Sequence, residues 1–367
     1  GLLPKWLISP DRNKGYLISE HNGHMYPTKT FDTAVNRLDQ ALRHATVLDA
    51  AYGREEVAGA FGWCMTDYYT HGDFGSGDRI CYHGVLDMFR NPKLASAVYA
   101  SAGDGAPVLA VGSEMDIGDY PAGSIGDNYL FTNADFVRVW RDDRLLGEFR
   151  PKGKRWRHLK HPPIPFNDTI GDVIEKGEGW SHRKAEALKD SLLAIQRFGV
   201  KIPAGEILKL AFRAVRYLAG PGTFTRLYAK YFENWGTSAP VYRFEAVKGG
   251  QVVARVTKSS NAALRLEVDA SRTALTEGET YDAAAVRVRI ADENGSTAPY
   301  AQLPVHFEVG GPLELIGPDT VCADGGLCGT YVRTTGQTGT GTLRITCPQT
   351  APVELTFRIT REESAEP

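Results

Sequence analysis

The chain has 367 residues, which is long enough for two or three domains that each bury a core. With 42% hydrophobic and 23% charged residues, its composition is that of an ordinary globular protein. A formal net charge of −2 excludes a dominant nucleic-acid or anionic-membrane surface, because either would need concentrated Lys and Arg. No stretch approaches the ~20 apolar residues that span a membrane.

The five cysteines are few, odd in number and lack the paired C-x-x-C spacing of a zinc site. Three of them, Cys322, Cys328 and Cys347, lie near the C-terminus, where the sequence leaves room for one disulfide. We expect no disulfide framework, and cysteine usage leaves the compartment open between bacterial cytoplasm and secretion. The first residues have no signal-peptide layout and start abruptly, so we expect the native N-terminus to be missing.

Residues 1–103 alternate between strand and helix patterns. The predicted elements are a strand at 16–20, an amphipathic helix at 33–52, an apolar strand at 57–64 and a helix opened by Asn91 and Pro92 that runs to about residue 101. This order is typical of α/β units with parallel strands.

Residues 104–261 predict a β-sandwich domain, because short alternating runs are separated by turns. Arg141–Gly147 and Lys248–Gly250 read as hairpin turns. The period becomes helical at about 161–236, which we interpret as an insertion between strands. One helix follows Ser181 and another follows Pro203, and each has a single apolar stripe, so we expect both to pack against the protein.

Residues 262–361 consist of alternating runs punctuated by Gly, Asn and Pro. About a hundred residues of this kind predict an immunoglobulin-like β-sandwich. The last residues, 362–367, form a polar tail.

Two segments carry the residues suited to chemistry. Glu20 ends the first strand, the position at which barrel enzymes place catalytic groups, although such a glutamate also serves in ion pairs and helix caps. The segment 61–90 is rich in Trp, Tyr, His and Asp, as sugar-binding loops are. On its own, that segment is equally compatible with a loop packed on a neighbouring domain.

These segments resemble the last two strand–helix units of the (β/α)8 barrel of glycoside hydrolase family 2. Glu20 in ISEHNGH stands where that family has its nucleophile. The strand-eight pattern is matched by Gly59–Trp63, by Asp67, by Gly84–Asp87 and by Asn91-Pro92-Lys93, with Asn91 where Arg is commoner. The downstream sandwich domains resemble the family's accessory domains.

The resemblance implies a retaining β-galactosidase-like hydrolase in which Glu20 forms a glycosyl-enzyme. The acid/base glutamate ends strand four in that family, and no carboxylate of this chain matches it. Trp63 would be the sugar platform, and His24 would approach the substrate, with His21 as a competing histidine. Asn22, Asp67 and His71 are candidates for contacts to sugar hydroxyls.

The resemblance also implies cofactors and partners. No cofactor is required; Mg²⁺ or Na⁺ binds in some members, and the sequence shows no ligand set for either. We expect a β-galactoside substrate, the N-terminal remainder of the enzyme and a possible homo-oligomer as partners, with no nucleic acid and no membrane. Two units cannot close an eight-stranded barrel, so the chain alone should be inactive. The alternative is a non-catalytic carbohydrate-binding or structural fragment with a vestigial barrel part.

Overall fold

The computed structural model describes residues 13–22, 28–72, 79–115, 125–152, 155–232, 240–259 and 263–362. The chain divides into two compact units that do not follow chain order. Unit 1 consists of Gly1–Tyr26, Thr33–Trp63 and Leu94–Ser260, and unit 2 consists of Pro27–Asp32, Cys64–Lys93 and Asn261–Pro367. The domain boundaries expected at 103 and 261 stay predictions.

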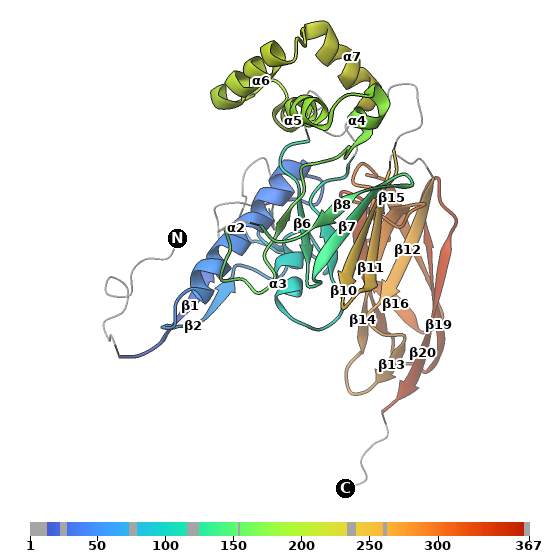
Figure 1. Ribbon diagram of the computed structural model, residues 1–367. Helices are drawn as coiled ribbons and strands as arrows, with labels where there is room; N and C mark the ends of the chain where they lie inside the picture. The colour runs from blue at the N-terminus through green and yellow to red at the C-terminus, as the bar shows by residue number, and fades with distance from the viewer. Residues whose placement is uncertain are drawn as a thin grey trace. The chain divides into compact units, whose positions relative to one another are not determined.

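Unit 1 begins with a strand–helix–strand motif in which β1 (Tyr16–His21) and β2 (Val57–Gly62) pair in parallel. The connecting helix α2 (Ala34–Tyr52) buries Leu38, Ala41, Ala45 and Leu48 at the expected three-to-four spacing. The Thr33 side chain caps it by accepting a hydrogen bond from the Asn36 amide. The predicted α/β order of this segment is therefore confirmed (Figure 1).

The next helix, α3, is Ser96–Ala102, so the predicted start at Asn91 and Pro92 is wrong. The Asn91 side chain does not cap a helix: its Nδ2 donates to a carboxylate oxygen of Asp87 at 2.8 Å and to the Cys328 carbonyl at 3.2 Å. The Asn91 side chain, which the sequence suggests as a helix cap, instead stabilises a turn that belongs to unit 2.

Two small antiparallel sheets follow in unit 1. One has the order β5-β6-β9 and the other the order β11-β10-β7-β8. The strands are β5 (Leu109–Val111), β6 (Tyr129–Thr132), β7 (Phe136–Arg141), β8 (Arg144–Phe149), β9 (Ile164–Pro165), β10 (Tyr242–Lys248) and β11 (Gln251–Lys258). Both predicted hairpins are confirmed, and Gly249 and Gly250 have φ of 57° and 80°, as a tight β10–β11 turn requires. Leu130, Val139, Phe166 and Phe244 fill the core.

Within the described residues, four helices lie between β9 and β10, and Figure 1 shows them grouped at one end of unit 1. They are α4 (Val173–Glu178), α5 (His182–Phe198), α6 (Ala204–Arg216) and α7 (Pro221–Tyr231). Helix α5 buries Leu188 and Leu192 completely. Helix α6 buries no residue, and Phe212 and Val215 are 68% and 76% exposed, so the expectation that both helices pack their apolar stripes is wrong for α6.

In unit 2, residues 264–361 form a β-sandwich of two sheets. Their strand orders are β12-β14-β18-β16 and β13-β20-β19-β15-β17. The strands are β12 (Leu264–Ala270), β13 (Ala274–Glu277), β14 (Ala283–Asp292), β15 (Pro304–Gly310), β16 (Leu313–Ile316), β17 (Thr320–Cys322), β18 (Leu327–Thr334), β19 (Gly339–Thr346) and β20 (Val353–Arg361). Val286, Val288, Phe307, Val332 and Phe357 fill the space between the sheets.

The earlier segments of unit 2 add a short hairpin, β3 (Tyr68–Tyr69) with β4 (Ile80–Cys81), which belongs to the loop that follows β2 in sequence. This loop is fastened to the sandwich by Asn91 and by the Tyr331 hydroxyl, which donates to the Met88 carbonyl. The separate segment Pro27–Asp32 is fastened to it by the Thr30 hydroxyl, which donates to the Asp324 carbonyl at 2.7 Å. In the described residues no helix has the length and apolar character needed to cross a membrane.

Candidate active site

The carboxyl ends of β1 and β2 bring two of the predicted site residues to one edge of the strand pair. His21 at the end of β1 pairs in register with Gly62 at the end of β2. The Trp63 amide donates to the His21 carbonyl, with 2.9 Å between nitrogen and oxygen. The Glu20 side chain is exposed, and Trp63 is 42% exposed. A carboxylate and an indole therefore reach solvent at the strand ends, where α/β folds bind their ligands.

Glu20 has no hydrogen-bond or ion-pair partner in the part of the chain that the structure describes. The oxygens of this exposed side chain are therefore open to an incoming group. This is what a nucleophilic carboxylate needs, in contrast to a glutamate engaged in a structural ion pair.

Asn22 follows in a left-handed conformation with φ of 59°, which Asn tolerates better than most residues. Its side-chain amide donates to His21 Nδ1, with 3.1 Å between the nitrogens. The His21 side chain in this contact is buried, whereas the neighbouring Glu20 side chain is exposed. His24 lies outside the described residues, so its role beside Glu20 stays a prediction.

A group of three rings lies behind the strand ends. The rings of His21 and His44 pack edge to face with centroids 5.5 Å apart, and His44 Nδ1 is 2.8 Å from the hydroxyl of Tyr99. Burial lowers the pKa of His21, and burial together with the charge of His21 lowers the pKa of His44 to about 4. Burial raises the pKa of the Tyr99 hydroxyl. All three groups are therefore neutral at pH 7.

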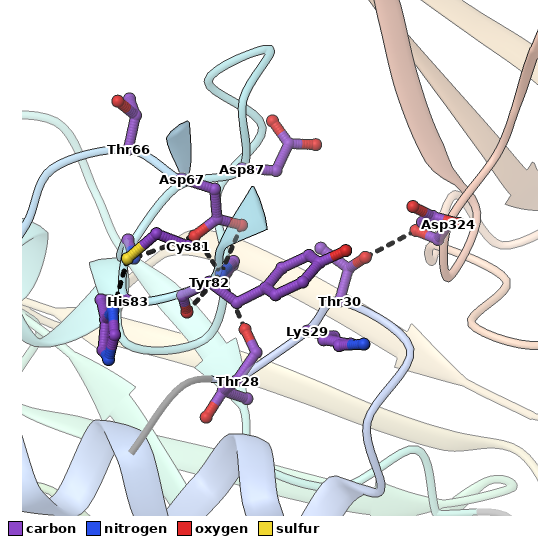
Figure 2. Close-up of polar contacts among 12 residues, drawn as sticks. Thr28, Lys29, Thr30, Thr66, Asp67, Cys81, Tyr82, His83, Asp87 and Asp324 are labelled. Carbon is purple, nitrogen blue, oxygen red and sulfur yellow. Dashed lines mark hydrogen bonds and ion pairs between the residues drawn. The ribbon is translucent and has the colours of Figure 1, made fainter. Parts of the chain in front are cut away.

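Asp67, a predicted sugar contact, belongs to unit 2 and is only 5% exposed. Its carboxylate lies 2.7 Å from the Lys93 ammonium and accepts a hydrogen bond from the Gly84 amide at 2.9 Å. The same ammonium donates to the Thr28 carbonyl at 2.7 Å and to the Tyr82 carbonyl at 3.3 Å. Figure 2 shows Asp67, Thr28 and Tyr82 gathered around this contact.

Burial acts on both members of this ion pair. It raises the pKa of Asp67 to about 6, although Lys93 and the Gly84 amide act in the opposite direction. Burial likewise lowers the pKa of Lys93, against the pull of Asp67. Desolvation outweighs the attraction in both groups, as is common for buried ion pairs. The oxygens of Asp67 are engaged inside the loop, so its suitability for a sugar contact rests on sequence resemblance alone.

Asp87 fixes the turn that follows. Its carboxylate accepts hydrogen bonds from the backbone amides of Phe89 and Asn91 and from the Asn91 side chain, each at 2.8 Å. The pattern from Gly84 to Lys93 therefore builds a hydrogen-bonded loop.

Nearby in the loop, Cys81 Sγ lies 2.5 Å from His83 Nδ1, with both side chains buried (Figure 2). All five cysteines are free thiols.

His71 is exposed in the same loop, after β3. It belongs to unit 2, whereas Glu20, Asn22 and Trp63 belong to unit 1. The structure therefore gathers Glu20, Asn22 and Trp63 at one strand edge, and it describes Asp67 and His71 as parts of a separate loop.

Sequence reasoning missed His44, Tyr99 and the partner of Asp67. His44 lies on the buried stripe of α2 between Ala41 and Ala45, and a histidine among alanines on an apolar stripe was the available signal. Tyr99 carried no signal of its own. Lys93 was part of the family pattern, but its ion pair with Asp67 joins positions too far apart in sequence to be seen.

The chain is similar to known glycosidases. Residues 264–356 match the model of the glycoside hydrolase family 2 C-terminal domain 5. A β-galactosidase of Thermoanaerobacterium thermosulfurigenes is 40% identical over 163 residues, which are 44% of this chain and 23% of that protein. A β-galactosidase of Thermoanaerobacter pseudethanolicus is 31% identical over 337 residues, which are 90% of this chain and 37% of that protein.

This chain belongs to glycoside hydrolase family 2. The matched part of the chain covers 23% and 37% of the length of these two β-galactosidases. A solved β-glucuronidase of the family has the same fold over 95% of this chain and 32% of its own, with a TM-score of 0.55 and 15% identity. The predicted family is thus confirmed, and the predicted sandwich architecture agrees with it.

Some family 2 members bind Mg²⁺ or Na⁺ near the site. Within the described ranges, no three or more His, Cys, Asp and Glu side chains are grouped in a way that could hold a metal ion.

Proposed function

We propose that this chain supplies the nucleophile of a retaining β-glycosidase, with Glu20 as the attacking carboxylate. The observation that carries the proposal is the exposed Glu20 at the carboxyl end of β1, in a parallel pair with β2 and without a partner among the described residues. Membership of family 2 supports it, since the segment ISEHNGH around Glu20 resembles the segment that carries the family's nucleophile. In this proposal β1, α2, β2 and α3 are the last two units of a (β/α)8 barrel.

The surface of the strand pair agrees with a barrel that is completed by other residues. Leu17 on β1 and Phe61 on β2 are 52% and 60% exposed, although both are large and apolar. Strands of a closed barrel bury such side chains against the lumen or the outer helices. Further strands would cover them, and the same strands would carry the acid/base.

The reaction would proceed in two displacements. A carboxylate oxygen of Glu20 attacks the anomeric carbon, the glycosidic C–O bond breaks, and the leaving oxygen takes a proton from the acid/base carboxyl. Water, deprotonated by that same carboxyl, then attacks the anomeric carbon and releases Glu20. Retaining geometry requires about 5–5.5 Å between the two carboxyl groups.

A β-galactoside is the substrate we propose, because the similar curated proteins carry the name β-galactosidase. The exposed indole of Trp63 offers an apolar face to a sugar ring at the same strand edge as Glu20. His24 and Asn22 would contact hydroxyls beside it. No cofactor takes part in this reaction.

The test is Glu20→Gln in the complete polypeptide that also supplies the acid/base. Turnover of an aryl β-galactoside should fall by at least about 10⁴-fold, because the amide cannot form the glycosyl-enzyme. With Glu20→Ala, added azide should restore turnover and yield the glycosyl azide of inverted configuration. Glu55→Gln is the matched control, since Glu55 is an exposed carboxylate next to the opposite end of β2.

An unchanged rate in Glu20→Gln would remove Glu20 from the mechanism and favour a non-catalytic role for this chain. A rate that falls equally in Glu55→Gln would mean that any charge change in unit 1 disturbs the enzyme.

A further inference from the structure

The three rings behind the strand ends form a closely fitted group. Gly62, at the end of β2, is the point at which they meet: a Cβ placed there would lie 2.4 Å from the Tyr99 hydroxyl oxygen and 3.3 Å from Cε1 of both His21 and His44. A contact of 2.4 Å is far below van der Waals separation. The end of β2 therefore has glycine because the rings occupy the space of a side chain.

The ring of His21 has a defined tautomer. Asn22 Nδ2 can only donate, so His21 Nδ1 accepts, and the proton of the neutral ring lies on Nε2. Nε2 is buried and has no hydrogen-bond partner in the described part of the chain. The His21 ring packs edge to face on the ring of His44, and its Cε1 lies close to Gly62.

Helix positions fix the other two rings. His44 is 1% exposed on the inner face of α2, and Tyr99 extends from α3 to meet it at 2.8 Å. The rings of His44 and Tyr99 also pack edge to face, with centroids 5.6 Å apart. This hydrogen bond joins the two helices behind the strands, and the His21 ring rests against it.

We propose that His44 and Tyr99 are positioning residues for Glu20, acting through His21 and Gly62. The inference rests on the proposed function of Glu20. His21 shares a peptide bond with Glu20, and its carbonyl holds the Trp63 amide, so a shift of the His21 ring moves nucleophile and platform together. A displacement of about 1 Å at a reacting group can cost about 100-fold in rate.

Tyr99→Phe is the mildest test, because it removes only the hydroxyl that bonds to His44. In the complete polypeptide we expect kcat for an aryl β-galactoside to fall about 10-fold while KM changes by less than about 2-fold. Trapping of Glu20 by a 2-fluoro glycoside should slow by the same factor. His44→Leu should have a larger effect of the same kind, and Tyr52→Phe, on the exposed end of α2, should have none.

A second control separates positioning from a general loss of structure. Leu38→Ala removes a buried side chain of the same helix six positions from His44, which is not an i,i+3 or i,i+4 neighbour of that ring, so it should lower the melting temperature and leave kcat unchanged. The inference is overturned if Tyr99→Phe and His44→Leu keep full kcat, or if Leu38→Ala lowers kcat as much as they do. Glu20→Gln tests the proposed function separately. If the Glu20→Gln enzyme is active, the proposed function is wrong. If it is inactive while Tyr99→Phe keeps full activity, only the positioning role is wrong.

Discussion

Glu20 and Asp67 are two carboxylates that the sequence presents alike, each a few residues after the core of a predicted strand. In unit 1, Glu20 is exposed and has no partner among the described residues. In unit 2, Asp67 is buried and holds Lys93 and the Gly84 amide. Glu20 is therefore available for reaction, whereas Asp67 stabilises the conformation of its loop. Substitutions at the first should change rate, and substitutions at the second should change stability.

The largest stability effect should come from Lys93→Ala. Removing the ammonium leaves Asp67 buried without its partner, which costs about 3–5 kcal/mol of unfolding free energy. The described tryptophans, Trp63, Trp140, Trp156 and Trp180, lie in unit 1, so hydrogen exchange of peptides from 79–93 reports the effect in unit 2 more directly than tryptophan fluorescence. Protection of these peptides should fall sharply.

The exposed pair of Arg43 and Asp39 on α2 is the control for this variant, with side chains 48% and 43% exposed. Arg43→Ala should cost less than about 1 kcal/mol. Equal effects of Lys93→Ala and Arg43→Ala would show that burial does not distinguish the two pairs.

An intermediate effect is expected from acid acting on His44. The pKa of His44 is about 4 in the folded chain and about 6.5 when unfolded, so the unfolded state binds the extra proton between these values. The stability of unit 1 should be complete above pH 6.5 and fall by up to about 3 kcal/mol as the pH drops to 4. Urea unfolding followed by tryptophan fluorescence at pH 7, 5.5 and 4 measures this slope.

His44→Leu should reduce the slope, because its side chain has no proton to bind, and the smaller slope that remains is expected from His21, whose pKa burial also lowers. His158→Gln is the matched control: His158 is an exposed histidine of unit 1, and its replacement should leave the slope as it is. An unchanged slope in His44→Leu would assign the acid sensitivity to other groups.

The smallest stability effect should be that of Glu20→Gln. An exposed side chain without a partner contributes little to folding, so unfolding free energy should change by less than about 0.5 kcal/mol. The same variant is expected to lose turnover, which makes it the counterpart of Lys93→Ala. A loss of stability comparable to that of Lys93→Ala would erase the contrast between the two carboxylates.

Sequence periodicity predicted β1, α2, β2, the hairpins and the strands of the C-terminal sandwich, because these elements bury one face and alternate accordingly. It predicted helices α5 and α6 equally well, but only α5 buries its stripe. An apolar stripe shows that a helix has a face to cover, and whether a neighbour covers it is decided by the tertiary arrangement.

The sequence suggests a candidate site where a single residue at a strand end carries the signal, as Glu20 does, and the structure places that residue at the end of β1. Contacts were missed where the partner is distant in sequence. Asp67 meets Lys93 across 26 positions and His44 meets Tyr99 across 55, and neither contact has a local pattern. The Asn91-Pro92 pair misled for the same reason, because Asn91 bonds to Cys328, 237 positions away.

Unit 2 is assembled from three stretches of chain, so its parts leave the ribosome at different times during synthesis. The loop of Cys64–Lys93 leaves the ribosome well before the strand β18, whose residues Cys328 and Tyr331 hold it. At about 5–20 residues per second, the loop waits on the order of ten seconds or more for these partners. In that interval Phe89 and Met88 have nothing of the sandwich to rest on. Slow translation or early termination between the two stretches would therefore leave this loop as the part most open to proteases and chaperones.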